Sequence, residues 1–181
     1  MNILDAQKDM RYGYLGGGVG MFVSGAVWAL AGVIAVYGET KQAIWALLIG
    51  GALIAPMSGI ITKALGRPDR GTQGNPLMGL AMEGTLWLVF CLPLAYLISQ
   101  MNPLWFFPSM LLVIGGRYLT FSTVYGMRLY WVCGLLLALA GGALAYFNIA
   151  FNLQPFAGAL IELTLAPFAF IQGRKEEENS K

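Results

Sequence analysis

The sequence has no histidine and only two cysteines among its 181 residues. Histidine and clustered cysteine are the usual protein ligands of zinc, haem and iron–sulfur groups, so these cofactors lose their ordinary ligands. Cys91 and Cys133 lie in separate hydrophobic stretches without a C-x-x-C spacing. We therefore expect two small packing residues, with no disulfide framework, no metal site and no cofactor.

Charge is also scarce, and this excludes an ordinary soluble domain. Only 11% of the residues are charged and 57% are hydrophobic, with a mean hydropathy of +0.66, whereas an average soluble domain has roughly 25% charged residues. A helix needs about 20 apolar residues to cross a bilayer, which leaves room for about six crossings. We predict an all-α polytopic membrane bundle of six transmembrane helices, forming one domain over residues 1–181.

Six apolar stretches fit this plan. They are separated by short turns, apart from one longer polar loop at 63–75, and a charged tail follows at 173–181. The predicted spans are residues 14–37, 43–62, 77–99, 105–125, 129–147 and 156–172.

The basic residues predict the orientation, because lysine and arginine are enriched in short cytoplasmic loops. An N-terminus in the cytoplasm leaves Lys41 as the only basic residue in an outer turn. Both termini are then cytoplasmic, and the positive charge is explained without nucleic acid. The inner set comprises Lys8, Arg11, Lys63, Arg67, Arg70, Arg128, Arg174, Lys175 and Lys181.

One motif occurs twice. Residues 76–86 and 155–165 carry Pro, Gly, Glu, Thr and Leu at matching offsets, and their acids, Glu83 and Glu162, are the only ones within predicted spans. Weaker echoes keep the same order: Tyr37-Gly38 with Tyr125-Gly126, and residues 50–53 with 141–144. The alternative is chance recurrence of short words in a chain rich in glycine and leucine.

The repeated motif predicts two halves, repeat A at about 12–99 and repeat B at about 104–172. Each half has three crossings, and an odd number inserts the second half upside down relative to the first. Inverted repeats are common in transporters, whose sites lie near the membrane midplane between the repeats.

Glu83 and Glu162 are the first candidate site residues, because an intramembrane carboxyl usually faces protein or water. Removal from water favours its uncharged form, which makes proton linkage a reasonable expectation. Gly79 and Gly158 lie one helical turn before these acids, so each carboxyl adjoins a patch without a side chain. The alternative is that each acid only holds the bundle together by hydrogen bonds.

Arg117 and two tryptophans complete the candidate set. Arg117 lies at a depth close to that of Glu83, so the two could form an ion pair. We then expect Glu83 to be the paired, structural acid and Glu162 the titrating one. Trp28 and Trp87 lie near mid-span and could wall a binding cavity, although packing is the more common role of such residues.

Three segments resemble a known family: residues 74–77, residues 83–85 and the stretch from Phe106 to Phe121. They are similar to those of small bacterial membrane proteins annotated only as a domain of unknown function. The resemblance covers most of the chain and implies a bacterial source, hence the inner membrane. It implies no activity, substrate or site residue.

The sequence as a whole favours a membrane transporter or channel for a small solute or ion, possessing no catalytic residues. Two alternatives remain open: a small-molecule-binding membrane subunit of a larger importer, and a non-transporting structural membrane protein. A homo-oligomer is compatible with each. An enzyme is disfavoured, because no nucleophile has an evident base beside it.

Overall fold

The computed structural model describes residues 1–67 and 74–178, and within these ranges helices and short turns make up the chain. Six segments are long and apolar enough to cross a membrane. The prediction of an all-α bundle of six transmembrane helices is confirmed, and the chain is a multi-pass membrane protein. The spanning helices are α2 (Gly18–Tyr37), α3 (Thr40–Ala64), α4 (Leu77–Met101), α5 (Phe106–Tyr125), α6 (Leu129–Tyr146) and α7 (Gln154–Glu178).

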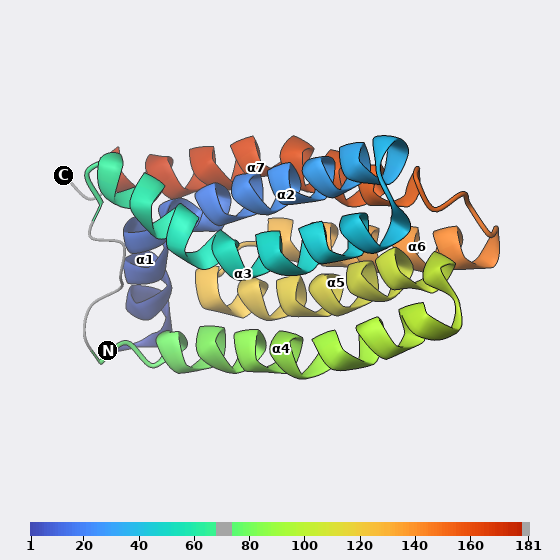
Figure 1. Cartoon of the computed structure of the whole chain (residues 1–181). Coiled ribbons are helices and arrows are strands. Elements are labelled where there is room, and N and C mark those ends of the chain that lie inside the picture. The colour runs from blue at the N-terminus through green and yellow to red at the C-terminus, as the bar shows by residue number, and fades with distance from the viewer. Residues whose placement is uncertain (68–73, 179–181) are drawn as a thin grey trace.

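Successive spanning helices run in opposite directions, so the chain crosses the bundle six times, and helix α1 and the last turns of α7 lie at the same end (Figure 1). The predicted tail is partly helical, because α7 continues to Glu178, and residues 179–181 lie outside the described part. Arg70, in the predicted inner loop, also lies outside it. We call this end of the bundle the α1 end.

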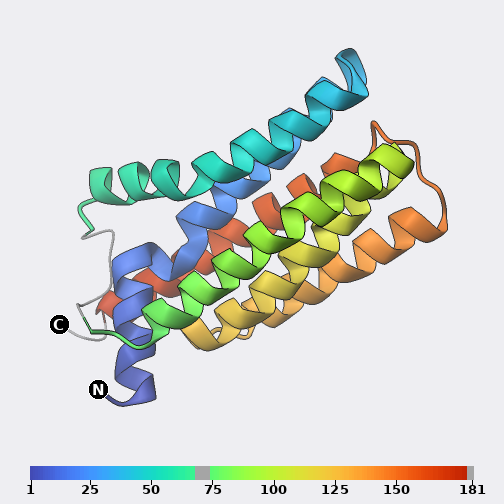
Figure 2. The same ribbon diagram turned by 60° about the horizontal axis from the view of Figure 1, so that its bottom comes forward.

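The α1 end is named after helix α1, a short helix that was not predicted from the sequence. Helix α1 spans Ile3–Tyr14 and is capped by the Asn2 side chain, which accepts a hydrogen bond of 2.9 Å from the Asp5 backbone nitrogen. Leu15, Gly16 and Gly17 follow with positive φ angles, which glycine adopts without steric cost. This break turns the chain, so that α1 lies across the end of the bundle while α2 runs along it (Figure 2).

Polar contacts tie α1 to the ends of two spanning helices. The Asn75 side chain, just before α4, donates to the Ala6 carbonyl at 3.0 Å and to an Asp9 carboxyl oxygen at 2.7 Å. Gln7 donates to the Thr123 carbonyl, and Arg11 to the Tyr125 carbonyl, at the end of α5. The bonds from Gln7 and Arg11 satisfy carbonyls in the last turn of α5, which the helix end leaves without partners.

The spanning helices pack chiefly in a chain of neighbours. Helix α2 packs on α3 and α7, and α5 packs on α4 and α6. Glycines allow the closest approaches: a methyl group added at Gly115 would come within 2.7 Å of the Gly134 carbonyl oxygen, and one added at Gly25 within 2.8 Å of the Leu163 side chain. Small residues serve helix association in membranes in this way.

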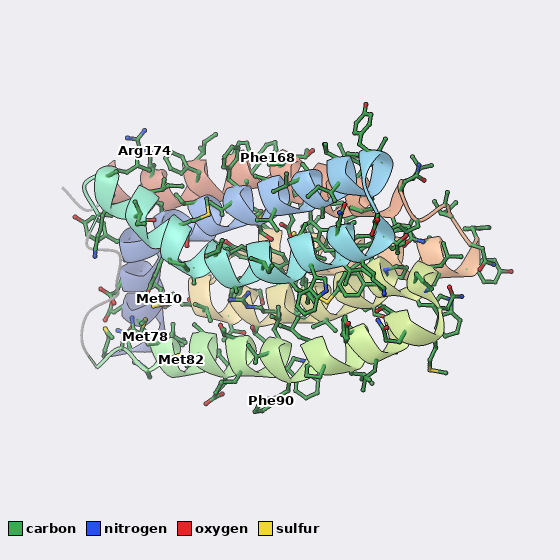
Figure 3. The ribbon with its side chains drawn as sticks, viewed as in Figure 1. Met10, Met78, Met82, Phe90, Phe168 and Arg174 are labelled. Carbon is green, nitrogen blue, oxygen red and sulfur yellow. The ribbon has the colours of Figure 1, made fainter. Side chains whose placement is uncertain are left out.

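Helices α3 and α4 form the periphery. Only four residues of each are buried, and their exposed side chains are mostly apolar, as expected for faces that meet lipid. Figure 3 shows Met82 and Phe90 projecting from α4 away from the other helices, and they are 64% and 70% exposed. The core therefore lies among α2, α5, α6 and α7.

Candidate functional site

Glu162 lies in this core. Its side chain is fully buried, on the face of α7 that Gln154 and Gly158 share at intervals of four residues, and both of these are buried too. Glu162 follows the start of α7 by 162 − 154 = 8 residues, or about 12 Å at about 1.5 Å per residue. The carboxyl is thus deep within the membrane-crossing part of the helix.

Three other helices bring polar groups beside the Glu162 carboxyl. Ser24 comes from α2, Arg117 and Tyr118 from α5, and Cys133 from α6. The Ser24 and Tyr118 hydroxyls are near enough to act on the carboxyl. In the structure as it stands, however, neither carboxyl oxygen of Glu162 makes a hydrogen bond of normal geometry with a described residue. Because buried polar groups in proteins nearly always have partners, this exception calls for an explanation.

Trp28 fills the patch that Gly158 was expected to leave open. A methyl group added at Gly158 would lie 2.6 Å from the Trp28 ring, which is fully buried and also meets Phe107, with 5.9 Å between ring centroids. The space beside Gly158 therefore admits the close approach of α2. Trp28 is a core residue one helical turn from Ser24, so both side chains face the same surface of α7.

Arg117 reaches from the core toward α4. Its Nη2 donates to the Thr85 hydroxyl at 3.1 Å, and its guanidinium carbon lies 5.0 Å from the centroid of the Phe121 ring. Thr85 in turn donates to the Ala81 carbonyl of its own helix at 2.9 Å. Arg117 thus connects the surroundings of Glu162 with the α4–α5 contact.

Buried polar atoms without hydrogen-bond partners gather in this part of the bundle. Among the side chains described, those of residues 1–67 and 74–174, they belong to four residues. Gln154 and Glu162 lie on one face of α7, and Trp28 packs between them on Gly158. The fourth residue is Arg117. The atoms are Trp28 Nε1, Arg117 Nε, Gln154 Oε1 and both carboxyl oxygens of Glu162.

An aromatic layer lies between Glu162 and the α1 end. The Tyr118 and Tyr130 rings stack with centroids 5.8 Å apart, and Tyr125 stacks on Tyr130 at 5.3 Å. Phe121 meets all three rings edge-on. The Tyr130 hydroxyl donates to the Gly16 carbonyl in the break after α1, so this layer is fastened to the start of α2.

Glu83 differs from Glu162 in its surroundings. The expectation that both acids face one interior is wrong for Glu83, which lies on the exposed face of α4. Helix α4 meets α5 through Gly84 and Thr85, and because successive residues are turned by about 100° around a helix, Glu83 points away from that contact. No ion pair joins Glu83 to Arg117, whose side chain instead donates to the Thr85 hydroxyl.

Gly79 and Trp87 share the exposed face with Glu83. A methyl group added at Gly79 would meet nothing within 4 Å, and Trp87 is 61% exposed. The interpretation of Trp87 as a wall of an interior cavity is therefore wrong. The four-residue spacing placed these three residues on one face correctly, but spacing alone does not tell which face of a helix meets its neighbours.

Three residues of the site were missed in the sequence analysis. Gln154 could have been predicted, because it precedes Gly158 by the same four residues that separate Gly158 from Glu162. Ser24 lay in an apparent stretch of small packing residues, and Tyr118 carried no signal beyond its position next to Arg117. In the described part of the chain no group of three histidine, cysteine, aspartate or glutamate residues could hold a metal ion.

The model of a family of unknown function (DUF7010) matches residues 3–172, nearly the whole chain. No curated protein and no solved structure matches.

Proposed function

We propose that this chain, which belongs to the family of unknown function DUF7010, is a membrane transporter or channel for a small solute or ion, linked to protons through Glu162. The observation that carries the proposal is the Glu162 carboxyl, fully buried in a membrane-spanning bundle with neither oxygen hydrogen-bonded by a described residue. A carboxyl in this position is costly. A proton-binding role explains why the cost is tolerated.

Close packing around Glu162 favours the proton as the species bound there. Gly158 is filled by Trp28, and Gly25 meets Leu163 on the same helix contact. A proton adds to a carboxyl oxygen without needing the space that a larger ion or solute needs. Arg117, within electrostatic reach of Glu162, is the partner that we propose for the charged form of this acid.

The packing pattern supports two inverted halves, with α2–α4 matching α5–α7. The first helix of each half packs on the second helix of that half, α2 on α3 and α5 on α6. The third helix of each half packs on the first helix of the other, α7 on α2 and α4 on α5. Glu162 then lies at the contact between halves, where transporters with inverted repeats bind their substrates. The contact of α6 with α7 has no comparable counterpart between α3 and α4.

The distribution of basic residues supports an orientation with the α1 end in the cytoplasm. Lys8, Lys63, Arg128 and Arg174 all belong to segments at that end, whereas Lys41 lies near the start of α3 at the opposite end. By the enrichment of lysine and arginine on the cytoplasmic side, we place both termini inside, and the resemblance to bacterial proteins supports the inner membrane.

The test is transport by the reconstituted protein, with Glu162→Gln and Glu83→Gln as a matched pair. Currents would be recorded on solid-supported membranes for a panel of inorganic ions, amino acids and sugars, with and without a pH gradient. We expect at least one pH-dependent current that Glu162→Gln abolishes and Glu83→Gln leaves largely intact. Folded variants that both transport as the native protein does, or a loss caused by Glu83→Gln alone, would contradict the assignment.

A further inference from the structure

Three buried side chains with unpartnered polar atoms follow one another from the start of α7 to Glu162, and we call them the column: Gln154, Trp28 packed on Gly158, and Glu162. Gln154 begins α7 and is fully buried, with its Nε2 donating to the Ile149 carbonyl at 2.8 Å and its Oε1 without a partner. Gly158 follows one turn later with the Trp28 ring against it, and Glu162 follows one turn after that.

The unpartnered donor and acceptor atoms of the column are suited to binding water molecules. Water needs two to four polar partners to be held in a protein interior. The Trp28 Nε1–H is a donor, while Gln154 Oε1 and the Glu162 carboxylate are acceptors, and none of these atoms has a partner among the described residues. Molecules entering between them would satisfy the three side chains and relay a proton to the carboxylate.

The opposite direction along α7 is closed. Past Glu162 the same helix presents Ala166, Ala169 and Gly173, which are buried, and a methyl group added at Gly173 would lie 2.5 Å from the Gly16 nitrogen. The stacked rings of Tyr118, Tyr125 and Tyr130 occupy the adjoining space. Glu162 is also nearer the Gln154 end, at 8 residues against 174 − 162 = 12 to the end of the apolar segment.

We infer that protons reach Glu162 from the end of the bundle opposite α1, the outer end in the proposed orientation, along the column formed by Gln154 and Trp28. This inference rests on the proposed function, since it specifies the route to the same acid. The proton passes from a hydronium ion in the column to a carboxylate oxygen of Glu162, leaving a water molecule and the neutral acid. Gln154 and Trp28 are positioning residues that hold the water.

The titratable, charged and polar groups that face Glu162 also affect its protonation, and they come from three neighbouring helices. Helix α5 contributes Arg117 and Tyr118, and α6 contributes Cys133. Helix α2 contributes Ser24 and Trp28, which do not titrate in the ordinary pH range. Segment η1 (Leu15–Gly17) packs on α7 near Ala169 and Gly173, about two and three turns from the acid. Arg117 thus supplies a fixed positive charge beside the site.

Trp28 supplies the readout for a test. A variant with phenylalanine in place of Trp45, Trp87, Trp105 and Trp131 leaves Trp28 as the only tryptophan of the chain. It would be reconstituted into liposomes and sorted by a C-terminal tag into two populations of opposite orientation. Trp28 emission would then be recorded at every combination of two lumenal and two external pH values, with stopped-flow steps of the external pH.

We expect the emission to follow the pH on the side opposite the termini in both populations, and to lose this response in Glu162→Gln. Gln154→Met should slow the response at least tenfold. The matched control is Gln100→Met, the same substitution at the same end of the bundle on α4, which should leave the rate unchanged. Circular dichroism and gel filtration would establish that each variant is folded.

The two proposals fail separately. A response that depends on Glu162 but follows the pH on the α1 side, or equal rates in Gln154→Met and Gln100→Met, would overturn the route and leave proton binding at Glu162 in place. A pH response that persists unchanged in Glu162→Gln, or no response at all, would overturn both.

Discussion

Glu162 is the residue at which burial and chemistry conflict most strongly. A buried polar group without a hydrogen bond costs about 1–3 kcal/mol of stability, and an apolar side chain of similar length would fill the same space. Functional sites retain groups that weaken the fold. The effect of Glu162 on stability therefore distinguishes a transport role from a purely structural one.

Replacement of Glu162 by methionine tests which of these two roles the residue has. We predict that Glu162→Met leaves the stability unchanged or raises it by about 1 kcal/mol, the saving from removing an unpartnered buried carboxyl. For a chain of this size that corresponds to a rise of roughly 2–4 °C in Tm. Thermal unfolding in detergent measures the change. A carboxyl that held the bundle together would give the opposite result, a clear fall in Tm.

The Gly158 position predicts a second effect at the scale of one residue. Gly158→Ala places a methyl group 2.6 Å from the Trp28 ring, and overpacking of this kind costs about 1–3 kcal/mol. Trp28→Leu in the same chain should recover part of the loss, because it removes the ring atoms in conflict. Gly79→Ala, which meets nothing within 4 Å, is the control and should be close to neutral. Thermal unfolding of the four proteins would decide the matter, and equal losses at Gly79 and Gly158 would count against the packing described.

Helix α1 shows what a single element adds to the bundle. The charges at the N-terminus predicted a cytoplasmic segment, but its helical structure depends on contacts with distant parts of the chain. Asn75 bonds to Ala6 and Asp9, and Gln7 bonds to Thr123. Sequence patterns read over short windows contain no information on such partners, so this element was missed.

Asn75→Ala should loosen α1 without unfolding the spanning helices. The substitution removes the donor of two hydrogen bonds and an acceptor for the Leu77 nitrogen, each worth about 0.5–1.5 kcal/mol. Hydrogen–deuterium exchange followed by mass spectrometry should show faster exchange over residues 3–14, with α5 and α6 unchanged. Asn152→Ala, at the opposite end of the bundle, is the matched control. Identical exchange in the two variants would argue against the tie between α1 and α4.

Helix α4 shows how far the sequence could lead. Its apolar length and the helix-opening Pro76 predicted a span beginning at Leu77, and α4 does begin there. The four-residue spacing also placed Gly79, Glu83 and Trp87 on one face. Which face packs was decided by Gly84 and Thr85 against Arg117 and Thr120 on α5, and that partner could not be read from α4 alone.

At the scale of the whole molecule, apolar length alone was sufficient for the six spans, because a bilayer admits few alternatives to long helices. Composition likewise predicted the all-α class. The site was harder to predict. The sequence did identify four of its residues: Glu162, Gly158, Trp28 and Arg117. Their separation from Glu83, however, follows only from the packing of α7 between α2 and α6. Helix contacts of this kind are properties of the assembled bundle.

The proposed orientation gives a whole-molecule prediction. With the α1 end in the cytoplasm, fluorescent protein fused after Lys181 should fluoresce in bacterial cells, and alkaline phosphatase fused there should be inactive. Fusions in the turn near Glu39, at the opposite end, should behave in reverse. Active phosphatase at the C-terminus would invert the orientation and, with it, the side from which protons are proposed to enter.

The central claim is that Glu162, buried among four helices, binds and releases the proton that links transport to pH. It is tested most directly by infrared difference spectroscopy of the reconstituted protein between acidic and alkaline buffer. We predict a carboxylic acid C=O band that disappears on the alkaline side, is missing in Glu162→Gln and persists in Glu83→Gln. A band that is lost in Glu83→Gln and retained in Glu162→Gln would contradict the account.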